Sequence, residues 1–261
     1  MASPAAGRAH PLLALVGLCN AALPGTRHSV GGALVRHLAH LWGGAPLVLG
    51  DSRCARLAWV PLSSVSPAPA PAAATHAAAG FVLLAEPRCA MNDSGRHVRE
   101  LVVQLRLPLD RLVVVHDGAW GRWAAGGAPN AGARVMMRRC FHRHSLRPPP
   151  PLVSSADLDL PLGRWAWKPQ GGGAGGHNGV RSVCSALATP HVRRLRVGIG
   201  RPARVEGVPA YVLERFGAAE AAALLQHVFP ELAAAVAAAA WAAGSVAAGR
   251  GGPAAGGGLG R

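Results

Sequence analysis

The sequence contains almost no lysine and few acidic residues. Of its 27 basic residues only Lys168 is a lysine, and the other 26 are arginines. With 12 acidic residues, the net charge is +15. Such a charge ordinarily suggests a polyanionic partner. An arginine excess together with abundant alanine, glycine and proline is also what a GC-rich coding sequence produces without selection for binding. The placement of individual arginines is therefore better evidence for RNA binding than the total charge.

The sequence also lacks paired cysteines. Its cysteines form no CxxC pair and are odd in number: Cys19, Cys54, Cys89, Cys140 and Cys184. This spacing argues against a structural zinc site or a closed disulfide set and favours a reducing compartment, so we predict no metal and no cofactor. The apolar run Pro11–Leu18 is too short to span a membrane, and no membrane partner is predicted; a signal-peptide core is the less favoured interpretation.

Two common catalytic motifs are missing as well. The glycine-rich stretch Gly171–Ser182, GGGAGGHNGVRS, lacks the GK[ST] ending of a nucleotide P-loop, which excludes the usual ATP or GTP cradle. No GxSxG motif occurs, and Cys19 has no recognisable base beside it in the sequence. An activated serine or cysteine nucleophile is therefore not predicted.

What the glycine-rich stretch does contain is His177 and Asn178 at the start of an expected helix. Glycines let the backbone approach a bulky polar ligand closely, and the amides at a helix start favour negative charge. By itself this pattern is typical of an anion-binding loop or of a flexible linker.

Short apolar runs alternate with helical patterns along much of the chain. The run Leu12–Leu18 predicts a strand buried on both faces of a parallel or mixed sheet. Further strands are expected at Arg56–Leu62, Phe81–Ala85, Leu112–Val115, Arg164–Lys168 and Arg193–Ile199. Helices are expected after Ser29, around Val98–Leu105, and over Ala218–Phe229 and Glu231–Ala248. In the last of the strands, Leu195, Val197 and Ile199 are expected to face inward and Arg194 and Arg196 outward, as a phosphate-binding or a merely solvated face.

Several polar residues stand where predicted strands end. Asn20 follows the first strand, at the sheet edge where α/β proteins bind ligands. His28 stands just before a helix start, whose positive potential keeps an imidazole neutral and able to accept a proton. Asp117 follows a buried strand and is placed to orient a histidine from a neighbouring connection. Local sequence alone leaves the alternatives of a surface histidine, an acidic turn residue and, for Asn92, a helix cap.

Five motifs occur together in one order: GLCNAALPGTRH at Gly17–His28, AMNDSG at Ala90–Gly95, VVHD at Val114–Asp117, GHNG after the glycine run, and LRVGIGRP at Leu195–Pro202. This combination resembles the bacterial-type peptidyl-tRNA hydrolase family over about Leu12–Gln226. The variant LPGTRHSVG is most similar to the animal, organellar branch. The resemblance implies an α/β fold: a single domain with a twisted mixed, largely parallel sheet flanked by helices.

The resemblance also implies a function and its residues. The chain is expected to hydrolyse the ester between peptide and tRNA in peptidyl-tRNA, with His28 activating a water and Asp117 holding the imidazole tautomer. Substrate binding is assigned to Asn20, Asn92 and Asn178, and binding of tRNA phosphates to Lys168 and Arg196. We expect a monomer in the mitochondrion or the cytoplasm, with the mitochondrion favoured.

Some positions depart from the family pattern. Cys19, Ala21 and Ala22 replace the usual Gly, Pro and Gly around Asn20, and Asp157 replaces a Glu. The alternative hypothesis is therefore a catalytically impaired protein of the same fold that binds tRNA or other RNA without cleaving the ester.

The expected domain organisation is a short leader over residues 1–10, the hydrolase-like domain over 11–230, and an Ala/Gly-rich tail over 231–261 that is first helical and then disordered. Two disordered insertions, 63–80 and 118–156, interrupt the domain. The second contains six arginines, two tryptophans and no acidic residue. It fits an RNA-binding arm, or translated non-coding sequence, which we favour.

Overall fold

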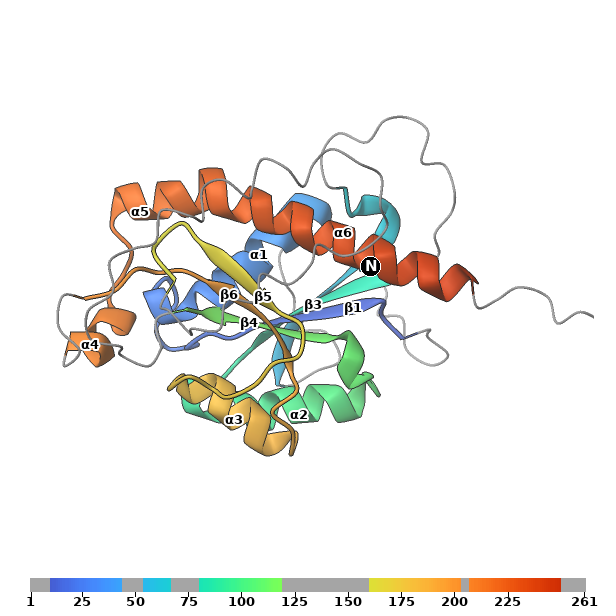
Figure 1. The fold of residues 1–261 in the computed structure, drawn as a ribbon, viewed down its shortest axis with the longest axis horizontal. Coiled ribbons are helices and arrows are strands. Elements are labelled where there is room, and N and C mark those ends of the chain that lie inside the picture. The colour runs from blue at the N-terminus through green and yellow to red at the C-terminus, as the bar shows by residue number, and fades with distance from the viewer. Residues whose placement is uncertain (1–9, 44–53, 67–79, 119–159, 203–206, 250–261) are drawn as a thin grey trace, which may run out of the picture.

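One six-stranded mixed sheet forms the centre of the structure (Figure 1). The computed structural model describes residues 10–43, 54–66, 80–118, 160–202 and 207–249. The strand order is β2-β3-β1-β4-β6-β5, with the four central strands parallel and both edge strands antiparallel. The strands are β1 (Leu13–Gly17), β2 (Ala55–Pro61), β3 (Phe81–Pro87), β4 (Leu112–Asp117), β5 (Trp165–Lys168) and β6 (Arg193–Val197).

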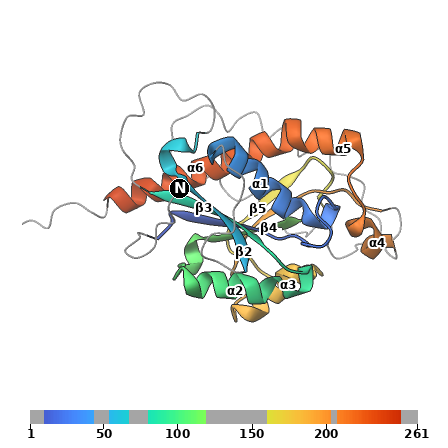
Figure 2. The ribbon, with the colours of Figure 1, turned by 180° about the vertical axis from the view of Figure 1, so that it is seen from behind.

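Helices cover both faces of this sheet (Figures 1 and 2). Helices α1, α5 and α6 lie on one side, and α2 and α3 on the other. The α-helices are α1 (Val30–Gly43), α2 (Ser94–Gln104), α3 (Asn178–Ala186), α4 (Val208–Leu213), α5 (Ala218–Ala223) and α6 (Phe229–Gly249). Shorter turns are η1 (Arg27–Ser29), η2 (Leu62–Ser64), η3 (Met91–Asp93), η4 (Leu109–Arg111) and the π-helical η7 (Leu224–Val228). The predicted α/β fold with a mixed, largely parallel sheet is confirmed.

The central strands are apolar throughout because both of their faces are covered. Alternate residues of β1 and β4 contribute to two separate clusters: Leu15 and Val113 pack under α1 and α6, whereas Val16 and Val114 pack under α2 and α3. This is the burial expected of strands in a sheet with helices on both sides. Strand β4 extends two residues beyond the predicted end, so that Asp117 is its last residue.

The helix at the C-terminal side belongs to the domain core. Elements α5, η7 and α6 follow one another without a break, and Leu232, Val236 and Ala240 are fully buried in the cluster beneath α1. The predicted domain boundary at residue 230 thus falls inside a core helix. Pro230 is accommodated because the π-helical turn widens the backbone just before it, where proline would otherwise clash with the preceding turn.

The same continuous helix, Ala218–Val246, is long and apolar enough to cross a membrane by length and composition alone. Its buried residues pack against the sheet and α1. A core helix passes the same test, so this feature is weak evidence for a membrane span.

Parts of the predicted insertions are described. Residues 63 and 64 belong to η2, and Val65 is fully buried, so the first insertion starts later than residue 63. Residues 67–79, the segment 119–156, the expected leader up to residue 9 and the tail from residue 250 lie outside the described residues.

The alternation predicted for β6 is confirmed, but the predicted exposure of its arginines is wrong. Arg194 and Arg196 do point to the face opposite Leu195, but they are only 2% and 6% exposed. The guanidinium of Arg194 lies under the glycine-rich segment and donates to the carbonyls of Gly173 (3.0 Å) and Gly172 (2.6 Å). A loop folded over this face buries side chains that strand alternation alone places in solvent.

Helix α1 lies unusually close to the sheet because of two glycines. A Cβ on Gly31 would lie 2.3 Å from the Val115 carbonyl oxygen, and one on Gly17 would lie 2.2 Å from the Gly31 oxygen. Both neighbours are backbone atoms that cannot move independently. The close approach fixes the start of α1, and with it the preceding turn η1, against the end of β4.

We predict that Gly31→Ala lowers the free energy of unfolding by about 1 to 3 kcal/mol, because the added methyl forces α1 away from the sheet. The matched control is Gly43→Ala at the other end of α1, where an added Cβ meets nothing within 4 Å. Urea unfolding followed by circular dichroism measures both. Equal stability of the two variants would contradict the proposed close contact.

Candidate active site

The carboxylate of Asp117 stands at the centre of a buried histidine cluster at the end of β4. The Nδ1 atom of His28 lies 2.7 Å from Asp117 Oδ1, and the Nε2 atom of His177 lies 2.8 Å from the same oxygen. His28 comes from η1 on the α1 side of the sheet, whereas His177 precedes α3 on the opposite side. Because Asp117 is the last residue of its strand, side chains from both layers can reach it around the sheet edge.

The hydrogen bonds determine which ring nitrogens carry protons. A carboxylate oxygen only accepts, so His28 donates from Nδ1–H and its Nε2 is left as the basic atom. His116 donates from Nδ1 to the backbone carbonyl of Asp117 at 2.7 Å, which holds the end of the strand. The ring of His177 lies between these two rings, with centroids 4.7 Å from both; it is tilted by 41° against His28 and meets His116 edge-on at 78°.

The electrostatics of the cluster keep Asp117 charged. Burial alone would raise the pKa of Asp117, but interaction with His177 and hydrogen bonds from His177 and His28 hold that pKa well below its usual range. Burial lowers the pKa of His116 well below its ordinary value; His177, Arg194 and Arg196 act in the same direction and Asp117 opposes them. At neutral pH the site therefore contains a buried carboxylate beside a neutral His116.

His28, Asp117 and His177 are also the described residues whose donor atoms could reach a common metal ion, since these atoms lie within 4.8 Å of one another. The same atoms form the two short hydrogen bonds to Asp117. A metal would have to displace both protons, so the arrangement is that of a hydrogen-bond network.

Arg27 anchors the turn that carries His28. Its guanidinium makes a two-point ion pair with Glu220 of α5, at 2.9 and 2.7 Å, and donates to the Ile199 carbonyl. The same group lies 4.3 Å from the centre of the Tyr211 ring. Arg27 is buried and Glu220 is partly exposed, and this planar, two-point contact ties η1 to α5.

The three asparagines predicted to bind substrate lie in or shortly after elements that converge beside the histidine cluster. Asn92 is exposed in η3, and Asn178 is exposed as the first residue of α3. These elements pack closely, because a Cβ on Gly179 would meet the sulfur of Met91 and the side chain of Leu18. Asn20, two residues after Leu18, is partly buried.

The turn around Asn20 is well ordered despite its departures from the family pattern. The Ala21 N–H donates to the Cys89 carbonyl at 2.9 Å, and the Ala22 N–H lies 3.3 Å from Asn20 Oδ1. The Asn20 N–H donates to the hydroxyl of Ser29. A proline at position 21 could not donate the first bond, so alanine here adds a contact to the neighbouring loop.

The two predicted phosphate-binding residues lie on neighbouring strands. Lys168 ends the edge strand β5 beside Arg194, and Arg196 pairs with Ala166 one step along the ladder. Lys168 is partly exposed, whereas Arg196 is buried, with Nη2 3.4 Å from the Gly118 carbonyl. Only Lys168 of this pair is open to direct contact with solvent or a ligand.

The cysteines nearest the site are poor nucleophiles. Burial, with a contribution from Glu86, raises the pKa of Cys19 to about 12, and burial raises that of Cys89 to about 11. Thiols with such values remain protonated at neutral pH. This agrees with the sequence, which predicts no cysteine nucleophile.

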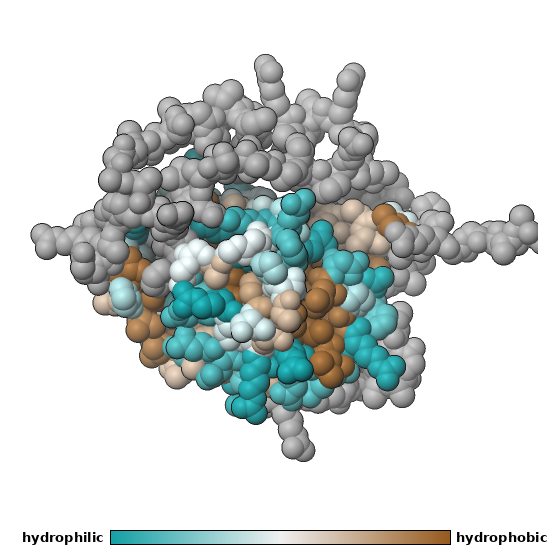
Figure 3. Space-filling view, turned by 60° about the horizontal axis from the view of Figure 1, so that its bottom comes forward, coloured by the Kyte–Doolittle hydropathy of each residue, from teal (hydrophilic) through white to brown (hydrophobic). Residues whose placement is uncertain are grey.

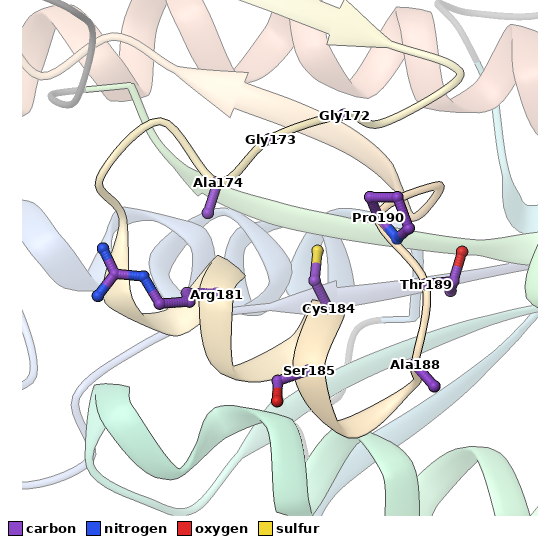
Figure 4. Close-up of a pocket in the computed structure, with 9 residues that line it drawn as sticks. All are labelled: Gly172, Gly173, Ala174, Arg181, Cys184, Ser185, Ala188, Thr189 and Pro190. Atoms are coloured by element: carbon purple, nitrogen blue, oxygen red, sulfur yellow. The ribbon is translucent and has the colours of Figure 1, made fainter.

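A cavity of about 540 Å³ lies between the glycine-rich segment and α3 (Figure 4). It is lined by Gly172, Gly173, Ala174, Arg181, Cys184, Ser185, Ala188, Thr189 and Pro190. None of the predicted site residues lines it, so the cavity flanks the histidine cluster and is not its centre. Figure 3 shows the molecule with the α2 and α3 layer turned towards the viewer. On this face hydrophilic and hydrophobic residues lie side by side. The polar cluster, rather than an apolar surface, therefore identifies the site.

The structure thus brings His28 and Asp117 together and adds two histidines that the sequence analysis did not assign to the site. His177 was noted only as part of the glycine loop, and His116 only as a neighbour of Asp117. A signal existed for His177, because a histidine directly before a helix start can accept a backbone hydrogen bond there. No local pattern shows that its ring reaches Asp117, which is 60 residues away.

Comparisons with known proteins match the chain to one family. A family model described as Peptidyl-tRNA hydrolase matches residues 14–120 and 132–248. The chain is 38% identical over 141 residues to a Peptidyl-tRNA hydrolase of Mycolicibacterium smegmatis, covering 54% of this chain and 53% of that protein. It is 36% identical over 150 residues to the protein of that name from Mycobacterium tuberculosis, covering 57% and 58%. The match thus spans about half the length of these curated relatives.

Solved structures show the same fold. A crystal structure of peptidyl-tRNA hydrolase from Acinetobacter baumannii has a TM-score of 0.57 and 21% identity, covering 92% of this chain and 98% of that one. An Arg119Gln mutant from the same organism has a TM-score of 0.59 and 21% identity, with 92% and 96% covered.

The Arg27–Glu220 pair predicts a specific pH dependence of stability. Hydrogen bonds from Arg27 lower the pKa of Glu220 below its ordinary 4.5, although burial opposes this. A carboxylate with a lowered folded pKa stabilises the protein above its unfolded pKa, and this contribution is lost as the pH falls through the folded pKa.

We therefore expect Glu220→Gln to lower the free energy of unfolding at pH 7 by about 1 kcal/mol or less, because Glu220 is partly exposed to solvent. The difference from the wild type should shrink steadily below the ordinary pKa of Glu220. Urea unfolding of both proteins from neutral to acidic pH measures it. A difference that stays constant over this range would contradict the charged pair.

Proposed function

The chain belongs to the peptidyl-tRNA hydrolase family, and from this premise we propose that it hydrolyses the ester bond of peptidyl-tRNA and releases free tRNA. The observation that carries the proposal is the 2.7 Å hydrogen bond between His28 and the buried Asp117 at the carboxyl edge of the sheet. A buried carboxylate that fixes one imidazole tautomer is what a general base requires.

The reaction follows from this tautomer. His28 Nε2 removes a proton from a water molecule as the water oxygen attacks the ester carbonyl carbon. The bond between that carbon and the ribose oxygen then breaks, and the ribose oxygen takes the proton back from the imidazolium. Asp117 stays ionised throughout and stabilises the imidazolium while it exists.

The amide side chains suit a peptide substrate. Carboxamides offer both donors and acceptors, so they match a peptide backbone without leaving an unpaired charge. We assign this binding, and the support of the developing oxyanion, to Asn20, Asn92 and Asn178. In favour of this assignment, the loops that carry all three meet beside His28 and Asp117, and Asn92 and Asn178 are exposed there.

The tRNA phosphates are assigned to Lys168 and Arg196. Lys168 offers a partly exposed ammonium group, while the buried Arg196 contributes positive potential from beneath the surface. Binding of an RNA backbone through such groups depends on salt, because it releases counterions.

The compartment, the branch of the family and the oligomeric state are proposed from the sequence. The variant LPGTRHSVG supports an animal, organellar branch and hence a mitochondrial location, with the cytoplasm as the alternative. We further propose a monomer that acts without a membrane. Fractionation of cells that express the tagged chain decides between the two compartments.

We predict that His28→Ala lowers single-turnover cleavage of N-acetyl-aminoacyl-tRNA by about a thousandfold, because the water loses its base. Affinity for tRNA should be almost unchanged, since His28 is 7% exposed and can offer little contact area. His40→Ala, at an exposed position of α1, is the matched control. Equal loss of cleavage and binding would indicate misfolding, and salt-sensitive binding without cleavage by the wild type would favour the RNA-binding alternative.

Lys168→Gln should raise KM with little effect on kcat and reduce the slope of log KM against log salt by about 0.7 to 0.9, the contribution of one phosphate contact. Charge reversal at Arg196 is a poorer test, because it would leave an unpaired charge in a buried position. Arg99→Gln on α2 removes an exposed charge elsewhere and serves as the control. An unchanged salt slope for the Lys168 variant would contradict the phosphate assignment.

A further inference from the structure

We propose that His177 is a positioning residue for the hydrolysis, fixing the Asp117 carboxylate and weakening its hold on the proton of His28. The proposal rests on the proposed function and concerns the same site. It starts from the 2.8 Å hydrogen bond between His177 Nε2 and Asp117 Oδ1, the oxygen that also accepts from His28.

The backbone of α3 fixes the tautomer of His177. The Val180 N–H donates to His177 Nδ1 at 3.2 Å, so His177 caps the helix with its own ring. A neutral imidazole has one acceptor and one donor, and with Nδ1 accepting, the proton must be on Nε2. Nε2–H therefore donates to Asp117. Protonation of Nδ1 would break the cap and place a positive charge at a helix start, where the backbone dipole opposes it.

The position of His177 makes it a positioning residue rather than a group that reacts. Its ring is 1% exposed and lies between those of His28 and His116, with centroids 4.7 Å from each. It has no open path to a substrate. Its donor instead prevents the Asp117 carboxylate from rotating away from His28, because both hydrogen bonds end on one oxygen.

The second hydrogen bond also has an electronic effect. An N–H group on Oδ1 draws off part of the negative charge that stabilises the imidazolium of His28. With His177 in place, the carboxylate therefore stabilises the imidazolium less strongly than it would with His28 as its only donor.

Other groups around His177 contribute to the same field. The titratable and charged residues on the surrounding elements are His28 in η1, Asp93 in η3, His116 and Asp117 in β4, Arg194 and Arg196 in β6, and Arg181 in α3 itself. A substitution at position 177 leaves the chemical identity of each of these other side chains unchanged.

The choice of variants separates the two roles of His177. Asparagine is a good helix cap, so His177→Asn can accept from the Val180 N–H, but its side chain is too short to donate to Asp117. His177→Ala loses both the cap and the donor. The two variants should therefore differ in melting temperature and share the same catalytic defect.

We expect His177→Asn to melt above His177→Ala, because it keeps the cap, and below the wild type, because the buried Asp117 loses a donor. Its kcat should fall by about tenfold with KM unchanged, because the base is less well held. The acid limb of its kcat/KM profile should move to higher pH by about half a unit. A merely structural role would lower stability without moving this limb. A wild-type kcat and pH profile in His177→Asn would overturn the proposal.

A second measurement does not need turnover. In the free protein, ¹⁵N imidazole NMR should show the Nε2–H tautomer for His177 and the Nδ1–H tautomer for His28, with the His28 ring titrating at higher pH in His177→Asn than in the wild type. The Nδ1–H tautomer for His177, or identical titration of His28 in both proteins, would overturn the proposal. If the wild type does not cleave the ester, the proposed function fails, while these spectra still decide the role of His177.

Discussion

The carboxylate of Asp117 accepts hydrogen bonds from histidines that approach it from opposite sides of the sheet, and the arrangement of the site depends on this shared oxygen. Burying a charge in this way is unfavourable unless donors compensate it. Here His28 and His177 supply them, at 2.7 and 2.8 Å. The carboxylate in return fixes both rings, so a single residue at a strand end joins the α1 layer to the α3 layer.

The rest of the domain holds these layers in place. On one side, Gly17 and Gly31 let α1 touch the backbone of the central strands, and Arg27 binds the turn before α1 to Glu220. On the other side, a Cβ on Gly95 would lie 2.0 Å from the Ser182 carbonyl oxygen, so α2 and α3 also pack through a glycine. Small residues at these contacts keep the distance between the layers short enough for the histidines to meet.

Two of the many arginines have structural roles in the fold. Arg27 and Arg194 are buried, and each holds a segment of backbone or a helix in position. Their charges do not form a solvated RNA-binding face. Of the two residues proposed to bind tRNA phosphates, Lys168 is partly exposed and Arg196 is buried.

The positions of the strands along the chain, the α/β class and the placement of Asn20, His28 and Asp117 at strand ends or before a helix were predictable from the sequence, because they follow from local patterns: apolar runs, turn residues and polar residues at strand ends. The three-dimensional arrangement was needed for contacts between distant segments. Strand alternation could not show that the glycine-rich segment folds over Arg194, and helix propensity could not show that α6 packs into the core beyond residue 230. The sequence by itself determined which side chains stand at the edge of the sheet. Only the tertiary structure decided that His177 shares the Asp117 oxygen with His28, because that contact depends on two helices packing on opposite faces of one strand.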